Sequence, residues 1–96
     1  MTHYLVAQIK INDPIEYDKY LEHFDDIFSK YKGEYLAVDE SPTLVEGKWD
    51  YTKSVLFKFN SKQDFQDWYY SKDYQKILKH RLNSSKSDII LIEGLE

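Results

Sequence analysis

The stretch Tyr4-Leu5-Val6-Ala7-Gln8-Ile9-Lys10-Ile11 predicts a β-strand whose two faces both need a cover. Because side chains alternate between the faces of a strand, one row here is wholly apolar and the other is mixed. The apolar row is Leu5, Ala7, Ile9 and Ile11, and the mixed row is Tyr4, Val6, Gln8 and Lys10. We expect helices of the same chain on the apolar row and a second copy of the chain on the mixed row.

A helix is predicted directly after this strand. Asp13 is a suitable N-cap, Pro14 fits the first helical position, and Glu16 lies three residues after the cap. Lys32-Gly33 ends the helix. Its apolar side chains recur at helical spacing, and they are Tyr17, Tyr20, Leu21, Phe24, Ile27, Phe28 and Tyr31. The opposite face is charged, which is typical of a helix that lies on a sheet.

The second helical region is predicted to be broken. Ser61 and Asp64 form a capping pattern at its start. Ser71 interrupts the region and caps a second helical piece, which ends at residues 83–85. The apolar side chains of the first piece are Phe65, Trp68 and Tyr69, and those of the second are Tyr74, Ile77, Leu78 and Leu82.

Three further strands are predicted, at residues 34–39, 54–59 and 88–93. In the first of these, simple alternation puts Tyr35 and Ala37 on one face and Leu36 and Val38 on the other. In the strand 54–59, the apolar row is Val55, Phe57 and Phe59, and the mixed row is Ser54, Leu56 and Lys58. The last strand is continuously apolar, which indicates burial on both faces. Residues 43–49 extend a strand or add a short one, with a bend at Gly47.

The order strand, helix, strand, strand, helix, strand predicts one four-stranded antiparallel sheet under two helices, the second of them broken. This is a ferredoxin-like α+β sandwich, and residues 1–96 are expected to form a single domain. The open face carries Val6, Leu56 and either Ile90 with Ile92 or Ile89 with Leu91. A face this apolar predicts a homodimer in which two sheets pack together.

The composition limits the partners. The chain has a net charge of −4 and interleaved lysines and acids, so we expect no nucleic acid partner. It has no cysteine, no export signal and no apolar run of membrane-spanning length, which favours a cytoplasmic protein without a membrane partner. Nine tyrosines, five phenylalanines and two tryptophans are an excess of aromatic rings, and such rings fill cores, line pockets and anchor interfaces.

Arg81 is the sharpest candidate for a binding residue. At 100° per residue its side chain falls among the apolar side chains of its helix, where a guanidinium needs an anionic partner. Three explanations stay open: an ion pair with Glu46 or Asp39, a position at the helix C-terminus that complements the dipole, or a ligand carboxylate. The candidate pocket around it consists of Trp49, Trp68, Tyr69, Tyr74 and Glu46. The alternative for the four aromatic residues is that their rings only fill the core and the interface.

No metal or cofactor is expected. The three histidines lie far apart in the sequence, no His pair has helical spacing of four, and no cysteine is available as a ligand. The serines are placed as helix caps, and no G-x-S-x-G elbow is present.

The sequence also resembles the DUF1330 family over essentially its whole length. The matching residues are Tyr4-Leu5-Val6-Ala7, Asn12-Asp13-Pro14, Gly33 with Tyr35-Leu36-Ala37, Val45-Glu46-Gly47 with Trp49, Trp68-Tyr69, Ser71 with Tyr74-Gln75, Arg81 and Glu93-Gly94. The resemblance implies a dimeric α+β barrel, built from two ferredoxin-like protomers. That superfamily includes cofactor-free monooxygenases, haem-degrading monooxygenases and muconolactone isomerase. Two functions follow as expectations: a cofactor-independent monooxygenase- or isomerase-like enzyme acting on a small aromatic or oxo acid, or a non-catalytic dimeric module that binds a small molecule.

Overall fold

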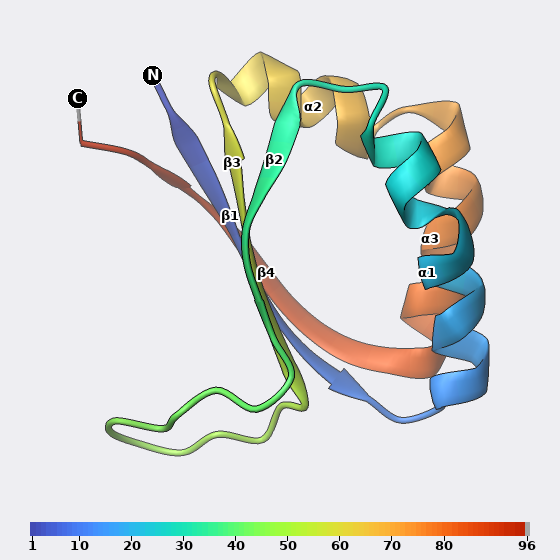
Figure 1. The fold of residues 1–96 in the computed structure, drawn as a ribbon, viewed down its shortest axis with the longest axis vertical. Helices are drawn as coiled ribbons and strands as arrows, with labels where there is room; N and C mark the ends of the chain where they lie inside the picture. Colours follow the sequence, from blue (N-terminus) through green and yellow to red (C-terminus); the bar gives the residue numbers. More distant parts are fainter. Residues whose placement is uncertain (96) are drawn as a thin grey trace.

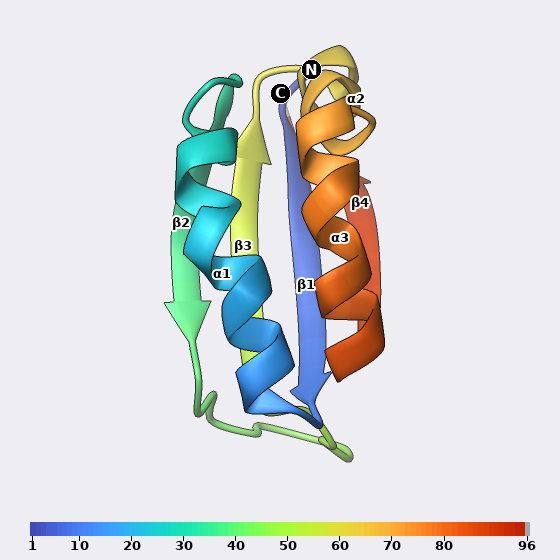
Figure 2. The same cartoon turned by 90° about the vertical axis from the view of Figure 1, so that its right-hand side faces the viewer.

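The helices of this protein cover one face of an antiparallel sheet, and the other face is left open (Figures 1 and 2). The structure is a computed structural model that describes residues 1–95. Within them the strand order is β2-β3-β1-β4. The elements are β1 (His3–Ile11), α1 (Pro14–Phe28), β2 (Gly33–Asp39), β3 (Lys53–Phe59), α2 (Lys62–Tyr69), α3 (Lys72–Ser84) and β4 (Ser85–Glu93). This is the ferredoxin-like α+β fold that the order of predicted elements indicated, and the prediction is confirmed.

Each helix begins directly after the residue that the sequence predicted as its N-cap. The Asp13 carboxylate accepts a hydrogen bond from the Glu16 amide, and the Ser61 hydroxyl accepts one from the Asp64 amide. Ser71 separates α2 from α3, and its hydroxyl accepts from the Tyr74 amide at 3.2 Å. The predicted break in the second helical region is therefore confirmed, and it turns the chain from α2 into α3 along the sheet (Figure 2).

Some boundaries differ from the predicted ones. Helix α1 ends at Phe28, four residues before Lys32, and β4 begins at Ser85, three residues before Asp88. Residues 40–52 connect β2 to β3 without a strand, and Gly47 in this loop has a positive φ of 92°. The early start of β4 is possible because β1 is long enough to pair with it back to Ser85, opposite Ile11.

The apolar rows of β1 and β3 face the helices and form the core. Leu5, Ala7 and Ile9 are buried, as are Val55, Phe57 and Phe59. Rings from every helix pack on this surface, and Trp68 of α2, which is 2% exposed, contacts rings from α1, α3 and β3. The core is therefore largely aromatic.

Strand β2 does not alternate as predicted, because it contains a β-bulge. Tyr35 pairs with Phe57, whereas Ala37 pairs with Leu56 and Val38 with Val55. Leu36 is the extra residue, so Tyr35 and Val38 share the helix-facing side and Ala37 lies on the open side. The predicted grouping of Tyr35 with Ala37 was wrong, since a one-residue insertion reverses the faces of all residues beyond it.

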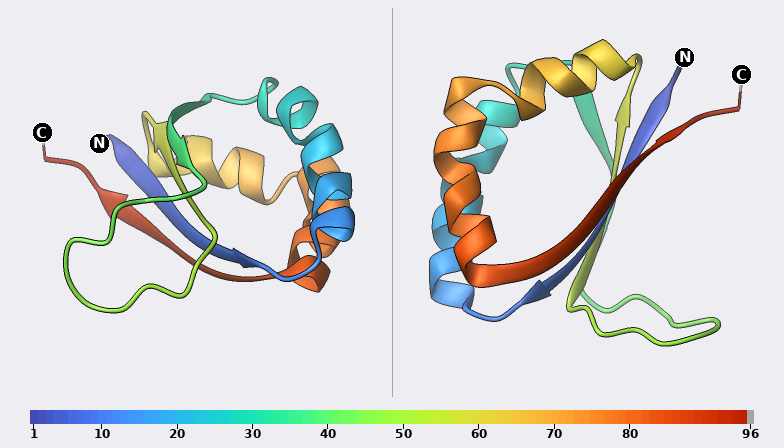
Figure 3. Two further views of the ribbon diagram at one scale, coloured as in Figure 1. Left: turned by 60° about the horizontal axis from the view of Figure 1, so that its bottom comes forward. Right: turned by 180° about the vertical axis from the view of Figure 1, so that it is seen from behind.

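The open face of the sheet is apolar. Leu5 pairs with Leu91 and Ala7 with Ile89 on the helix-facing side, so Ile90 and Ile92 lie on the open side. Ile90 is 60% exposed, and it continues a row across the sheet with Val6, Leu56 and Ala37. Figure 3 shows that none of the helices of residues 1–95 covers this side and that the loop 40–52 projects from it.

Gly33, the first residue of β2, allows α1 to come close to the sheet. A Cβ atom at this position would lie 2.6 Å from ring carbons of both Phe28 and Phe59. Both rings are buried, so neither can move aside without disturbing the core. Gly33→Ala is expected to lower the free energy of unfolding by about 2–3 kcal/mol, measured by urea denaturation.

Gly47→Ala is the matched control for Gly33→Ala. A Cβ atom at Gly47 meets no atom within 4 Å, so only its positive φ opposes the change. We expect a loss of about 1 kcal/mol there. Equal urea midpoints for Gly33→Ala and the unmodified protein would contradict the close approach of the two rings.

Candidate functional site

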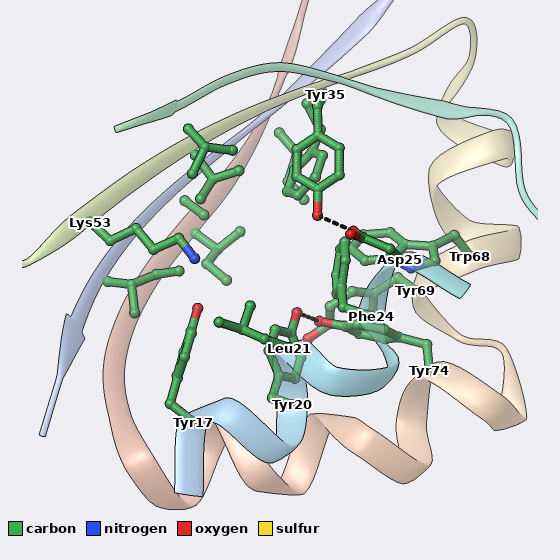
Figure 4. A pocket seen from close by; sticks show the side chains of 17 residues that line it. Tyr17, Tyr20, Leu21, Phe24, Asp25, Tyr35, Lys53, Trp68, Tyr69 and Tyr74 are labelled. Carbon is green, nitrogen blue, oxygen red and sulfur yellow. Dashed lines mark hydrogen bonds between the residues drawn. The ribbon is translucent and has the colours of Figure 1, made fainter. Parts of the chain in front are cut away.

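A cavity of about 310 Å³ lies between the sheet and the helices (Figure 4). Its walls are mainly apolar and include Leu5, Ala7, Val55, Phe57, Trp68 and Ile89. Its polar groups come from tyrosines of both layers, from Asp25 and from Lys53. The volume is at the lower end of the roughly 300–1,000 Å³ that is usual for small-molecule sites. The cavity therefore suits a compact, planar molecule.

Lys53 is the cationic group of the cavity. It opens β3 two residues before Val55, so its side chain lies on the same row as the core residues, and it is 8% exposed. Its ammonium lies 5.2 Å from the centroid of the Tyr17 ring. No carboxylate among residues 1–95 forms an ion pair with it. Burial lowers the pKa of Lys53, and the charges of Glu40 and Asp25 oppose this only in part.

Two tyrosines from different helices meet at the helix side of the cavity. The hydroxyl oxygens of Tyr20 in α1 and Tyr74 in α3 are 2.9 Å apart and share a hydrogen bond. Burial raises the pKa of both phenols, and the contact with Tyr74 raises the pKa of Tyr20 still more. Both phenols are therefore protonated at neutral pH and act as hydrogen-bond donors.

Arg81 of α3 lies behind this tyrosine pair. It is 3% exposed, and its guanidinium carbon is 5.9 Å from the centroid of the Tyr20 ring. Burial opposes its charge, but electrostatic interactions with Tyr74 and Tyr20 outweigh this and raise the pKa of Arg81. Within residues 1–95 it forms no ion pair with Glu46, Asp39 or any other acid, and its Nε has no acceptor. At neutral pH the buried guanidinium thus has neutral phenols as its neighbours, the Tyr20 ring and the Tyr74 hydroxyl.

A hydrogen bond joins two further residues that line the cavity. The Tyr35 hydroxyl of β2 donates to the Asp25 carboxylate of α1 at 3.1 Å. Burial, together with the negative charge of Asp25, raises the pKa of Tyr35. Tyr35 reaches α1 because it pairs with Phe57 and so lies on the helix-facing side of β2.

The predicted site residues fall into two groups. Trp68, Tyr69 and Tyr74 line the cavity, and Arg81 lies one layer behind it. Trp49 and Glu46 are in the loop 40–52 and do not line it. The Trp49 ring packs at 4.9 Å on Tyr51, which donates a hydrogen bond to Asp88 on the open side of β4. These two residues therefore lie away from the cavity of their own chain, because the loop bends toward the opposite face of the sheet (Figure 3).

The sequence prediction missed the polar residues that the cavity presents. Lys53 was left out because the strand was taken to begin at Ser54. A strand that begins one residue earlier places Lys53 in the row of Val55 and Phe57, and this alternation was the available signal. Tyr17 and Tyr20 were assigned to the core from their helical spacing, which does not distinguish a filled core from a cavity wall.

Side chains suited to a metal do not gather in the described part of the chain. Residues 1–95 contain no group of three or more His, Cys, Asp or Glu side chains with the geometry to hold an ion. His80 lies in α3 with its Nδ1 bonded to the Glu16 carboxylate of α1, so it joins two helices. Over the same residues, no helix has the length and apolar character that a membrane crossing requires.

Comparisons with other proteins agree on the fold. A family model described as a domain of unknown function (DUF1330) matches residues 2–95. None of the curated proteins matches the sequence. A solved protein of unknown function from Rhodopseudomonas palustris superposes with a TM-score of 0.82 at 14% identity, over 99% of this chain and 83% of its own.

Two other solved structures are similar. SnoaB, a cofactor-independent oxygenase from Streptomyces nogalater, has a TM-score of 0.71 at 10% identity, over 99% of this chain and 94% of its own. A dimeric ferredoxin-like protein of unknown function from Jannaschia sp. CCS1 has a TM-score of 0.75 at 12% identity, over 98% of this chain and all of its own. Likeness at these identities establishes the fold and not the activity.

Proposed function

The chain belongs to the DUF1330 family, a domain of unknown function, and from its cavity we propose that it binds a small planar organic acid beside Lys53. One observation carries this proposal. Lys53 holds an ammonium among apolar side chains, and no carboxylate of residues 1–95 forms an ion pair with it, since Glu40 and Asp25 act on it only from a longer distance. A buried cation without a partner is unfavourable, so a ligand carboxylate that pairs with it gains the interaction that the protein leaves open.

The remaining walls support an aromatic or conjugated acid. Rings of Phe57, Trp68, Tyr69 and Tyr74 border the space, and aromatic walls suit a flat ligand. Arg81, the cation expected from the sequence, is kept from the ligand by Tyr20 and Tyr74, so its role is to support these phenols.

A cofactor-independent monooxygenase- or isomerase-like activity is the chemical function we propose for this site. The fold shared with SnoaB, which is described as a cofactor-independent oxygenase, supports it. The alternative is a non-catalytic dimeric module that binds the same class of acid. Oxygen consumption or isomerisation of a bound hydroxy or oxo acid separates the two, since the module would bind the acid and leave it unchanged. We propose the cytoplasm as the compartment of either.

The functional unit in this proposal is a homodimer formed through the open face of the sheet. The apolar row of Ala37, Leu56, Val6 and Ile90 supports this arrangement, because such a row is unfavourable in water. The dimeric protein from Jannaschia, which has the same fold, supports it too. Two-fold symmetry places the same row on both partners.

Benzoate binding tests the assignment of Lys53. In a Trp49→Phe background Trp68 is the only tryptophan, and its fluorescence reports on the cavity that it lines. Lys53→Met is expected to weaken benzoate binding about tenfold to a hundredfold, because a charge-assisted contact contributes about 1.5–3 kcal/mol. Binding should also weaken as the pH rises through the lowered pKa of Lys53, below its ordinary 10.5, since the neutral amine no longer attracts the carboxylate.

Lys79→Met is the matched control for this experiment. Lys79 is an exposed lysine of α3, so its loss changes the net charge by the same amount without touching the cavity. Its binding curve should overlay that of the Trp49→Phe protein. If Lys53→Met and Lys79→Met bind benzoate equally well, the proposed site is wrong.

A further inference from the structure

Building on the proposed function, we propose that the Tyr20–Tyr74 pair donates a hydrogen bond to a second oxygen of the bound acid. The ligand class is then a hydroxy- or oxo-substituted aromatic or conjugated acid. Its carboxylate lies at Lys53 on the sheet side, and its second oxygen lies at the tyrosine pair on the helix side (Figure 4).

The number of donors and acceptors supports this assignment. Two phenols carry two hydroxyl hydrogens, and the hydrogen bond between Tyr20 and Tyr74 uses one of them. Among residues 1–95 no acceptor takes the other hydrogen. Both residues line the cavity, so the open direction for this donor is toward a ligand. A buried donor without an acceptor is costly, and a ligand oxygen removes that cost.

Arg81 determines the direction of the free hydrogen. A guanidinium only donates, so it cannot accept a hydrogen from either phenol. It faces the Tyr20 ring and interacts with the Tyr74 hydroxyl, and its positive charge repels hydroxyl hydrogens while it attracts oxygen lone pairs. The remaining O–H therefore turns away from Arg81 and toward the cavity. Polarised by the cation behind it, this donor is suited to an oxygen that carries negative charge, such as a phenolate or enolate.

The cavity consequently has two separate polar ends joined by aromatic walls. Lys53 comes from β3 in the sheet, whereas Tyr20 and Tyr74 come from α1 and α3. Tyr17 lies beside Lys53, and Tyr35 is occupied by Asp25, so neither is part of the second end. A ligand with only one polar group would leave one end unpaired, which favours acids that carry a further oxygen.

Two matched probes test the second end: 3-nitrobenzoate, and 4-hydroxy-3-nitrobenzoate, whose ionised phenol absorbs visible light. The unmodified cavity is expected to bind the hydroxylated probe about tenfold more tightly than the other. The bound phenol should also ionise at a pH about one unit lower than in solution, since a hydrogen bond to an anion contributes about 1.5–3 kcal/mol. Tyr20→Phe with Tyr74→Phe should abolish both effects, so that the two probes bind this variant with equal affinity.

The double variant removes both partners of one hydrogen bond and leaves no orphaned hydroxyl in the core. Because it also removes the Tyr74 hydroxyl that interacts with the buried Arg81, urea denaturation checks that the variant is folded before the titrations. Tyr31→Phe is its control, because the Tyr31 hydroxyl bonds to Asp73 outside the cavity. This control should keep the tenfold preference and the shifted ionisation. A double variant that keeps them would overturn the inference.

The same titrations separate this inference from the proposal on which it rests. If both probes bind in a Lys53-dependent way and with equal affinity, the tyrosine pair is not a donor, while the acid site stands. If neither probe binds, or Lys53→Met leaves both affinities unchanged, the proposed acid site is wrong. The inference about the tyrosine pair is then wrong as well.

Discussion

Trp68→Ala is expected to lower the free energy of unfolding by about 3–5 kcal/mol, a large part of the 5–15 kcal/mol typical of a small domain. The indole is 2% exposed and occupies the point where all layers meet. It lies 5.2 Å from the Phe28 ring of α1, 4.4 Å from the Tyr74 ring of α3, and stacks on Phe59 of β3 at 5.7 Å. The cavity already borders Trp68, so truncation enlarges an existing void that neighbouring rings cannot fill.

Urea denaturation at one fixed protein concentration measures this loss, since self-association would make stability depend on concentration. Trp68→Phe is the control. It retains a ring against Phe59 and removes an indole N–H that has no acceptor among residues 1–95. We expect it to cost about 1–2 kcal/mol, well below alanine. Equal losses of unfolding free energy for Trp68→Ala and Trp68→Phe would mean that an aromatic ring at this position does not stabilise the core.

Leu56→Lys combined with Ile90→Lys is expected to raise the dissociation constant of the proposed dimer roughly a thousandfold or more. Both side chains lie on the open face, on either side of Val6 in one cross-strand row. In a two-fold dimer each copy contributes both lysines to the interface, and every such charge is buried without a partner. The helix-facing core is untouched, because Leu56 and Ile90 point away from it.

Sedimentation equilibrium at micromolar concentration tests this prediction. The unmodified protein should have twice the mass of the 11.6 kDa chain, and the double variant should have the mass of one chain. Ile15→Lys is the control, since Ile15 is 78% exposed on α1 and the change adds a charge away from the open face. An unmodified protein that sediments as a single chain would refute the dimer.

The periodicity of apolar residues and the helix-capping residues were sufficient to predict the fold. The alternation of β1, the cap at Asp13 and the break at Ser71 all depend on neighbours within a few residues, and each is found in the structure. The bulge at Leu36 escaped prediction because it depends on pairing with β3, which is distant in sequence. Local patterns cannot show where a paired strand accommodates an extra residue.

The site was only partly predictable for a related reason. The helical spacing of Arg81 correctly placed it inside, at 3% exposure, but it could not show that phenols would surround it instead of an acid. Trp49 was assigned by its residue type, and its loop bends to the other side of the sheet. Lys53 was overlooked because a strand boundary was placed one residue late. Residue type suggests what a site contains, and tertiary contacts decide which residues reach it.

The bulge at Leu36 affects how relatives of this protein can differ in the length of β2. Tyr35 pairs with Phe57 and Val38 with Val55 on the two sides of the bulge, so a homologue that lacks the extra residue would form a regular strand with the same two side chains toward the helices. Relatives that are one residue shorter at this position would therefore keep the part of the cavity wall that Tyr35 and Val38 form.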